Sequence, residues 1–229
     1  EISECLVGSE MCIRDSFTER IIQRYHSLRK GLLSEESLYH YIDETLDFIG
    51  PALEKAKYLM NEDEIREMFE KLIVNSFDSR KIEKIHPSFS DIIQQMSPID
   101  AQNLKCFSVE ENLPICEIRM ELEKGGHRIL QTNIFCSNKF CDSIEQQSIS
   151  LSSLSRMGLI SIAYDQYLTD DSVYKIFDSL PIVVDFKNQI EAANKSNNSN
   201  QKFDLQKGVA KLTPVGKAFI DVCLRPLPT

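Results

Sequence analysis

The feature that most constrains this fold is a dense run of helix signals over residues 61–100. Asn61 is a favourable N-cap, and Glu64 follows three residues later, where its carboxylate completes a capping box. Apolar side chains then recur at spacings of three and four, which places them on one helical face. They are Ile65, Met68, Phe69, Leu72, Ile73 and Phe77. We therefore expect an amphipathic helix that begins after Asn61.

Two shorter helices are expected to follow in the same run. Pro87 suits the first position of a helix, because its missing backbone donor has no partner there in any case. Ser97-Pro98 ends that helix and caps the next one, and Asp100 repeats the cap-plus-acid pattern. The apolar positions are Phe89, Ile92, Ile93, Met96, Leu104 and Phe107. Together these signals predict a compact helical core.

Several short segments in and after this run carry a family resemblance. The matching residues are 64–72 (EIREMFEKL), Asp78-Ser79, 86–89 (HPSF), Ser97-Pro98, Asp100-Ala101, 154–160 and 211–219. On these residues the chain resembles the abortive-infection alpha family, a bacterial domain of unknown function, over about residues 42–223. The resemblance implies a role in phage defence. It implies no reaction, because the matching pattern consists of helix faces and caps.

Composition narrows the class of protein. The chain has 229 residues, 42% hydrophobic and 27% charged, as in ordinary globular proteins. No apolar run approaches the roughly 20 residues that a membrane span needs. The formal charge of −9 works against non-specific nucleic-acid binding by the chain as a whole. Seven cysteines without regular spacing do not indicate a disulfide framework, and the apolar neighbours of Cys106, Cys116 and Cys223 predict buried thiols in a reducing cytoplasm.

The first sixteen residues stand apart from the rest. Residues 6–16 (LVGSEMCIRDS) resemble the translation of a sequencing adapter, and they show no apolar period. We therefore treat residues 1–16 as an artefactual leader and expect the true N-terminus to be missing. Residues 17–33 predict a basic amphipathic helix docked on a core, and a further helix begins after Ser34. Residues 17–110 are thus expected to form an N-terminal helical bundle.

From residue 111 the predicted structure becomes mixed. Residues 116–122 alternate in polarity, Gly125-Gly126 predicts a tight turn, and residues 127–136 return as a second strand, which together indicate a β-hairpin. Residues 142–157 predict a helix that ends at Gly158 and leads into a short strand. The expected core positions of that helix are Ile144, Ile149, Leu151 and Leu154.

The helix over residues 142–157 and the segment 211–219 both resemble parts of a winged-helix domain. The sequence LSSLSRMGLI is similar to the end of a recognition helix, and KLTPVGKAF is similar to the corner after the wing. Thr213 is expected to cap a helix with Pro214 at its first position. Its core residues are expected to be Val215, Phe219 and Val222. An insertion over residues 165–206 is expected to hold helices at 172–177 and 184–193, then a disordered-looking stretch at 194–202.

The expected recognition helix has few basic residues for contacts with DNA. Arg156 is its only basic residue, whereas readers of DNA usually place several cations there to neutralise phosphates. The remaining candidates for contacts with the DNA backbone lie on the expected wing, at Lys202, Lys207 and Lys211. Direct DNA binding is therefore the less favoured alternative to a protein-interaction module.

The sequence indicates no catalytic residues, no cofactor and no metal. Cys136 and Cys141 are five residues apart, but no partner at zinc-site spacing accompanies them. Gly216-Lys217 lacks the first glycine and the Ser or Thr of a phosphate loop.

The expected fold is therefore α+β and mainly α, with a helical bundle at 17–110 and, over residues 111–229, a β-hairpin and a winged-helix-like part. The expected function is a non-enzymatic, cytoplasmic component of antiviral defence that acts through contacts with a protein partner or with itself. Two alternatives remain open. One is a winged-helix DNA-binding regulator, and the other is a membrane-associated effector whose N-terminal anchor is missing.

Overall fold

The computed structural model describes residues 63–76, 81–197 and 199–225, and these residues form two compact units. The first unit ends at Ala101 and is rejoined from Lys217, whereas the second comprises Gln102–Gly216. Seven α-helices and one four-stranded antiparallel sheet occur among the described residues, which confirms the α+β class. The expected leader at 1–16 and the expected helices at 17–33 and after Ser34 lie outside them.

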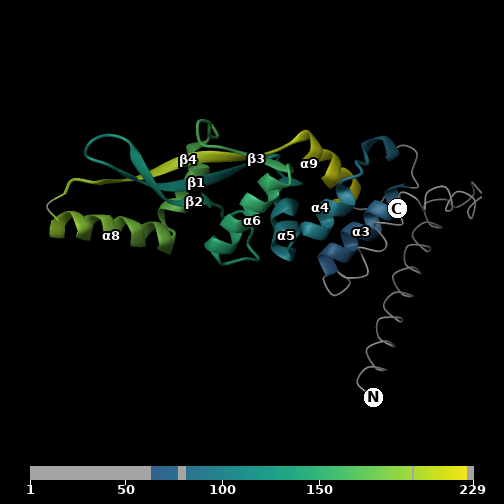
Figure 1. Cartoon of the computed structure of the whole chain (residues 1–229), viewed down its shortest axis with the longest axis horizontal. Coiled ribbons are helices and arrows are strands. Elements are labelled where there is room, and N and C mark those ends of the chain that lie inside the picture. The colour runs from purple at the N-terminus through teal and green to yellow at the C-terminus, as the bar shows by residue number, and fades with distance from the viewer. Residues whose placement is uncertain (1–62, 77–80, 198, 226–229) are drawn as a thin grey trace, which may run out of the picture. The chain divides into compact units, whose positions relative to one another are not determined.

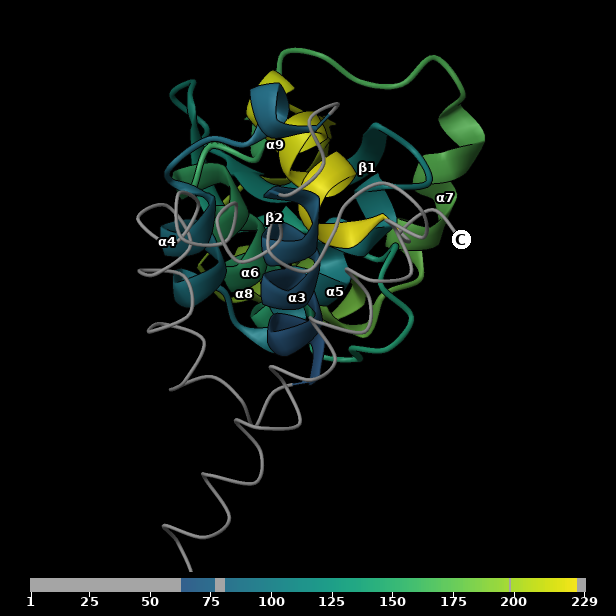
Figure 2. The same ribbon diagram turned by 90° about the vertical axis from the view of Figure 1, so that its right-hand side faces the viewer.

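The long helix of the first unit is α3 (Asp63–Ser76), as the apolar period predicts. Asp63 and Glu64 lie in its first turn, where the helix dipole favours negative charge. Its buried apolar side chains are Ile65, Met68, Phe69, Leu72, Ile73 and Val74. The cap position Asn61 and the apolar Phe77 fall outside the described residues. In Figure 2, α3 and α4 (Phe89–Gln95) lie side by side, in agreement with their contacts.

The capped turn between α4 and α5 (Pro98–Phe107) forms as the sequence predicts. The backbone N–H of Ser97 donates to Asp100 Oδ2 at 2.9 Å, and Asp100 N–H donates to Ser97 Oγ at 3.2 Å. This reciprocal pair is a capping box. Helix α4 begins at Phe89, two residues after Pro87, and the short 3-10 helix η1 (Ile82–Lys84) precedes it.

The segment after Phe219 packs against α3 within the first unit. It forms a π-helical turn, η3 (Ile220–Leu224), after the last α-helix, α9 (Pro214–Phe219). Lys71 Nζ donates to the carbonyl oxygen of Leu224 at 2.7 Å, and Asn75 Nδ2 donates to that of Val222 at 2.6 Å. These two side chains satisfy carbonyls that a helix end leaves unpaired.

Two of the three core residues expected in this region are buried. Phe219 meets Phe89 edge to face with ring centroids 5.2 Å apart, and Val222 is fully buried. The prediction for Val215 was wrong, because 43% of its surface is exposed.

The second unit is built on a sheet with strand order β2-β1-β4-β3. The strands are β1 (Asn112–Glu121), β2 (His127–Ile134), β3 (Ile160–Ala163) and β4 (Lys202–Leu212). The predicted hairpin is confirmed, and Gly125 and Gly126 make its turn with φ of 86° and 82°. Strand β1 pairs with β4 along the whole length of β1, from Asn112↔Lys211 to Glu121↔Lys202.

One face of the sheet is covered by the segment between β3 and β4 (Figure 1). This segment contains η2 (Asp171–Tyr174), α7 (Lys175–Asp178) and α8 (Pro181–Asn197), so both helices predicted there are present. Its buried side chains Tyr174, Phe177 and Val183 pack on Cys116, Ile118 and Ile134.

The expectation of a disordered stretch at 194–202 was wrong. Helix α8 continues to Asn197, and Asn194 Oδ1 accepts hydrogen bonds from Ser199 Oγ and from the backbone N–H of Gln201. Strand β4 then begins at Lys202, so residues 202–206 belong to the sheet rather than to an insertion.

Helix α6 (Ile144–Arg156) packs against β2 and β3. Ser143 caps it by accepting from Gln146 N–H at 3.3 Å, and Gly158 ends it with φ of 74°. Leu151 and Leu154 are buried as expected, but the prediction for Ile149 was wrong, because 64% of its surface is exposed. The buried face instead contains polar residues, namely Gln147, Ser148 and Ser150.

The corner after β4 also forms as predicted. Thr213 Oγ1 accepts from the backbone N–H of Gly216 at 2.9 Å and donates to the carbonyl oxygen of Gly158 at 2.6 Å. Thr213 thus caps α9, with Pro214 at its first position.

Candidate functional site

The most elaborate polar arrangement of the second unit is centred on a β-bulge in the hairpin. Strand β1 pairs Cys116 with Ile134 and Ile118 with Gln131, so Thr132 and Asn133 together lie opposite Glu117. Asn133 has φ of 54°, a left-handed conformation that asparagine tolerates better than most residues. A bulge of this kind turns side chains away from the regular alternation of a strand.

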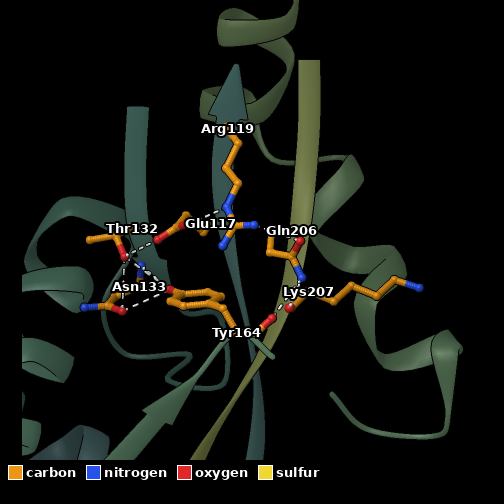
Figure 3. A network of polar contacts seen from close by, with 7 residues as sticks. All are labelled: Glu117, Arg119, Thr132, Asn133, Tyr164, Gln206 and Lys207. Carbon is orange, nitrogen blue, oxygen red and sulfur yellow. Dashed lines mark hydrogen bonds and ion pairs between the residues drawn. The ribbon is translucent and has the colours of Figure 1, made fainter. Parts of the chain in front are cut away.

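The carboxylate of Glu117 lies at the middle of this arrangement (Figure 3). The residue is only 3% exposed. Arg119 Nε donates to its Oε1 at 2.6 Å, and Thr132 Oγ1 donates to its Oε2 at 3.0 Å. The buried negative charge is therefore paired and hydrogen-bonded, as a buried charge must be.

Tyr164, directly after β3, links the bulge to the rest of the network. Its hydroxyl donates to Asn133 Oδ1 at 3.0 Å and accepts from Asn133 N–H at 2.8 Å. Burial raises the pKa of Tyr164, which further favours the protonated hydroxyl. The guanidinium carbon of Arg119 lies 5.9 Å from the centre of the Tyr164 ring.

Gln206 on β4 closes the network into a ring. Arg119 Nη1 donates to its Oε1 at 3.0 Å, and its Nε2 donates to the carbonyl oxygen of Tyr164 at 3.0 Å. The Tyr164 ring fits here because residue 208 is glycine. A Cβ at that position would lie 2.5 Å from the ring.

The network continues into α6. Asn133 Nδ2 donates to Ser152 Oγ at 2.9 Å, and Ser148 Oγ donates to the carbonyl oxygen of Thr132 at 2.7 Å. Ser152 lies at the edge of the outer face of α6, which also carries Glu145, Ile149 and Arg156, and all four residues are exposed. The bulge thereby fixes the position of a helix whose other face is open to solvent.

The side chains of this network hold one another and the neighbouring backbone in position. Its carboxylate is paired with an arginine, and its hydroxyls and amides bond to one another and to backbone atoms. Among residues 63–76, 81–197 and 199–225, no three His, Cys, Asp or Glu side chains gather in a group that could hold a metal ion. Cys136 and Cys141 are both free thiols.

The lysines proposed for DNA contacts lie along β4 and do not share one face. Lys202 begins the strand and Lys211 is near its end, roughly 30 Å away at about 3.3 Å per residue. Side chains alternate along a strand, so Lys207 and Lys211 share a face and Lys202 is on the other. Lys202 also lines a hollow beside the hairpin turn together with Glu121 and Glu123.

Two of these lysines contact the segment between β3 and β4. Lys207 Nζ lies 2.8 Å from Asp171 Oδ1 and 5.4 Å from the centre of the Tyr174 ring, and the hydrogen bond to Asp171 raises the pKa of Lys207. Lys211 donates to the side chain of Gln166. Arg156, the fourth candidate, lies in the last turn of α6.

The network residues were not predicted as a site from the sequence. The alternation over 116–122 does place Glu117 and Arg119 on one face of a strand, but their partners Tyr164 and Gln206 are remote in sequence. Arg119 and Gln206, for example, are separated by 87 positions. Only the pairing of β1 with β4 brings them together.

Comparison with family models gives one finding. The model described as abortive infection alpha matches residues 16–223. Neither the curated proteins nor the solved structures give a match.

Proposed function

Because this chain belongs to the abortive infection alpha family, we propose that it is a non-enzymatic component of bacterial antiviral defence. The family match over residues 16–223 carries this proposal. We place its action in the cytoplasm, where thiols stay reduced. The five cysteines that the structure describes are free.

The mode of action that we propose is contact with a protein partner, and Phe140 is the candidate anchor. It is 90% exposed and lies in the segment between β2 and α6. Aromatic side chains, phenylalanine among them, are enriched at protein interfaces relative to the rest of the protein surface.

The backbone around Phe140 is fixed from inside the unit. The Phe140 N–H donates to Asn138 Oδ1 at 2.9 Å, and Asn138 is 3% exposed. Gln147, which is also buried, donates to the carbonyl oxygen of Cys141. A segment that is ordered before binding loses less conformational entropy when a partner arrives, which favours affinity.

The outer face of α6 also suits a protein better than a phosphate backbone. Its exposed residues are one acid, one base, one serine and one isoleucine (Glu145, Arg156, Ser152 and Ile149). The two charges offset each other, and Ile149 adds an apolar contact. Phosphate binding needs several cations on such an element.

The alternative function is a winged-helix DNA-binding regulator. One observation favours it, namely that α6 is followed by β3 and by the antiparallel β4, with β1 on the other side of β4. Strand β2 lies in the sequence before α6, where a winged helix has a helix. The distribution of Arg156, Lys202, Lys207 and Lys211 favours the protein-contact function over this one.

The third function, a membrane-associated effector, remains a prediction that depends on sequence before Phe17. Within the part of the chain that the structure describes, no helix has the length and apolar character of a membrane span.

The defence role is tested by phage challenge. Bacteria that express the chain, with the vector alone as control, are infected with a varied panel of phages at low and high multiplicity. We expect a reduced efficiency of plating for at least some phages, together with early growth arrest at high multiplicity. Equal plating and growth with and without the chain across the panel would remove the basis of the proposal.

A further inference from the structure

Three buried polar atoms of the second unit have no hydrogen-bond partner among the described residues. They are Nδ2 of Asn103 on α5 and, on α6, Oε1 of Gln147 and Oγ of Ser150. The three residues are 0%, 2% and 3% exposed. Buried polar groups in folded proteins almost always have a partner, so an unpaired group of this kind calls for an explanation, and an ordered water is one.

The amide orientations at this cluster are set by the backbone. Asn138 Oδ1 accepts from the N–H of Phe140, so its other side-chain atom is the NH₂ group, which donates to Asn103 Oδ1 at 2.7 Å. The remaining atom of Asn103 is therefore a donor. Gln147 Nε2 donates to the carbonyl oxygens of Cys141 and Asn138, so Gln147 Oε1 is an acceptor. Reversing either amide would bring two donors or two acceptors together.

The residues that carry the unpaired atoms are also linked to one another. Asn103 and Gln147 both bond to Asn138. Ser150 is three residues after Gln147 on α6, and residues at this spacing lie on the same side of a helix. The residues that carry this donor, this acceptor and this hydroxyl are therefore linked to one another through Asn138 and through α6.

The molecule that fits must accept from Asn103 and donate to Gln147, and it must be small enough for a packed interior. Water meets all three requirements, and a buried water typically makes about three hydrogen bonds. We infer that Asn103, Gln147 and Ser150 form a binding site for one buried water molecule. This site lies beyond the proposed defence function and joins α5 to α6 beneath the segment that carries Phe140.

Water-selective nuclear Overhauser measurements on the ¹⁵N-labelled full chain test the site directly. A long-lived buried water gives cross-peaks at the Asn103 side-chain amide with the sign expected for slow exchange. The absence of such cross-peaks, or a sign typical of fast surface water, would overturn the inference.

A pair of serine variants gives a second readout. Ser150→Ala and Ser155→Ala make the same change on the same helix, so the gain in helix propensity is common to both. Ser155 is only half-buried and is not part of the cluster. If Ser150 bonds to the water, Ser150→Ala has the lower urea midpoint of the two. If its hydroxyl is buried without a partner, removing it raises the midpoint at least as much as Ser155→Ala does, and the site is refuted.

Discussion

At the scale of single residues, the backbone restricts which residue type two positions accept. One position lies very close to a neighbouring backbone, and the other has a left-handed conformation. Gly216, in the first turn of α9, lies against Leu159, the residue before β3, and a Cβ there would be 2.0 Å from the carbonyl oxygen of Leu159. Asn133 holds a left-handed backbone conformation while its side chain bonds to Tyr164 and Ser152. Substitutions at each position give a prediction for stability that isolates this effect of the backbone.

Gly216→Ala is expected to lower the free energy of unfolding by about 1–3 kcal/mol, because the added methyl group meets backbone that cannot turn aside. Val215→Ala is the matched control, since Val215 is 43% exposed in the same helix turn. Urea denaturation followed by circular dichroism measures both variants. Equal stability of the two variants would show that the approach at Gly216 is not tight.

Asn133→Ala and Asn133→Gly both remove the side-chain hydrogen bonds, but only alanine must also adopt the left-handed conformation. That conformation costs a residue with a Cβ roughly 1–2 kcal/mol. Both variants are therefore expected to be less stable than the parent chain, with alanine lower than glycine by about that amount. Alanine as stable as glycine in thermal unfolding would rule out backbone strain at the bulge.

At the scale of elements, local signals predicted much of the fold, and non-local contacts account for what they missed. The Ser97–Asp100 capping box, the hairpin turn and the Thr213 cap each depend on a few neighbouring residues, and all three formed. Helix α6 was predicted with Ile149 inside, because apolar side chains are usually the buried ones. Its buried face instead combines Leu151 and Leu154 with polar residues, since β2 and the loop before α6 supply partners to Gln147 and Ser148.

The same limit applies to the candidate site. Glu117 and Arg119 can be placed on one strand face from their spacing, but the ring through Tyr164 and Gln206 requires the pairing of β1 with β4. That pairing spans a long segment that includes α6, α7 and α8, so no local sequence pattern reveals it.

Two phenylalanines in the segment between β2 and α6 are expected to differ sharply in their effect on stability. Phe135→Ala should cost about 3–5 kcal/mol, because Phe135 is fully buried and stacks on Phe107 with centroids 6.1 Å apart. Phe140→Ala should change stability by less than about 0.5 kcal/mol, because Phe140 is 90% exposed. Guanidinium denaturation of both variants provides the check. A large loss with Phe140→Ala would mean that this side chain is part of the core.

Two cysteine thiols in the core between the sheet and the segment that covers it should make the free energy of unfolding depend on pH. Burial raises the pKa of Cys116 from 9.0 to about 12 and that of Cys136 from 9.0 to about 11. Folding therefore favours the protonated thiols. Their contribution is complete below about pH 9 and is lost as the pH rises through 11 to 12.

When the pH is raised from 8.5 to 10.5, the urea midpoint is accordingly expected to fall by more in the parent chain than in the Cys116→Ala variant. Midpoints measured at several values of pH in that window test this. Identical pH profiles for the two proteins would show that the Cys116 thiol does not contribute to the dependence.

At the scale of the whole molecule, charge argues against DNA as the main partner. The chain carries a formal charge of −9, and the candidate basic residues are spread along β4 and the end of α6. At low salt we expect no binding to random duplex DNA with a dissociation constant in the micromolar range or tighter. Fluorescence anisotropy measures this. Tight binding that weakens steeply with added salt would indicate several phosphate contacts and favour the regulator.

The efficiency of plating of a sensitive phage on cells that express matched variants tests the central claim most directly. The variants are Phe140→Ala, Tyr167→Ala as a second exposed aromatic, and the double variant Arg156→Ala/Lys202→Ala, with protein levels confirmed by immunoblot. If defence acts through a protein contact at Phe140, protection is lost with Phe140→Ala and kept with the other two. Protection that survives Phe140→Ala but disappears with the double variant would contradict this account and point to a nucleic-acid partner.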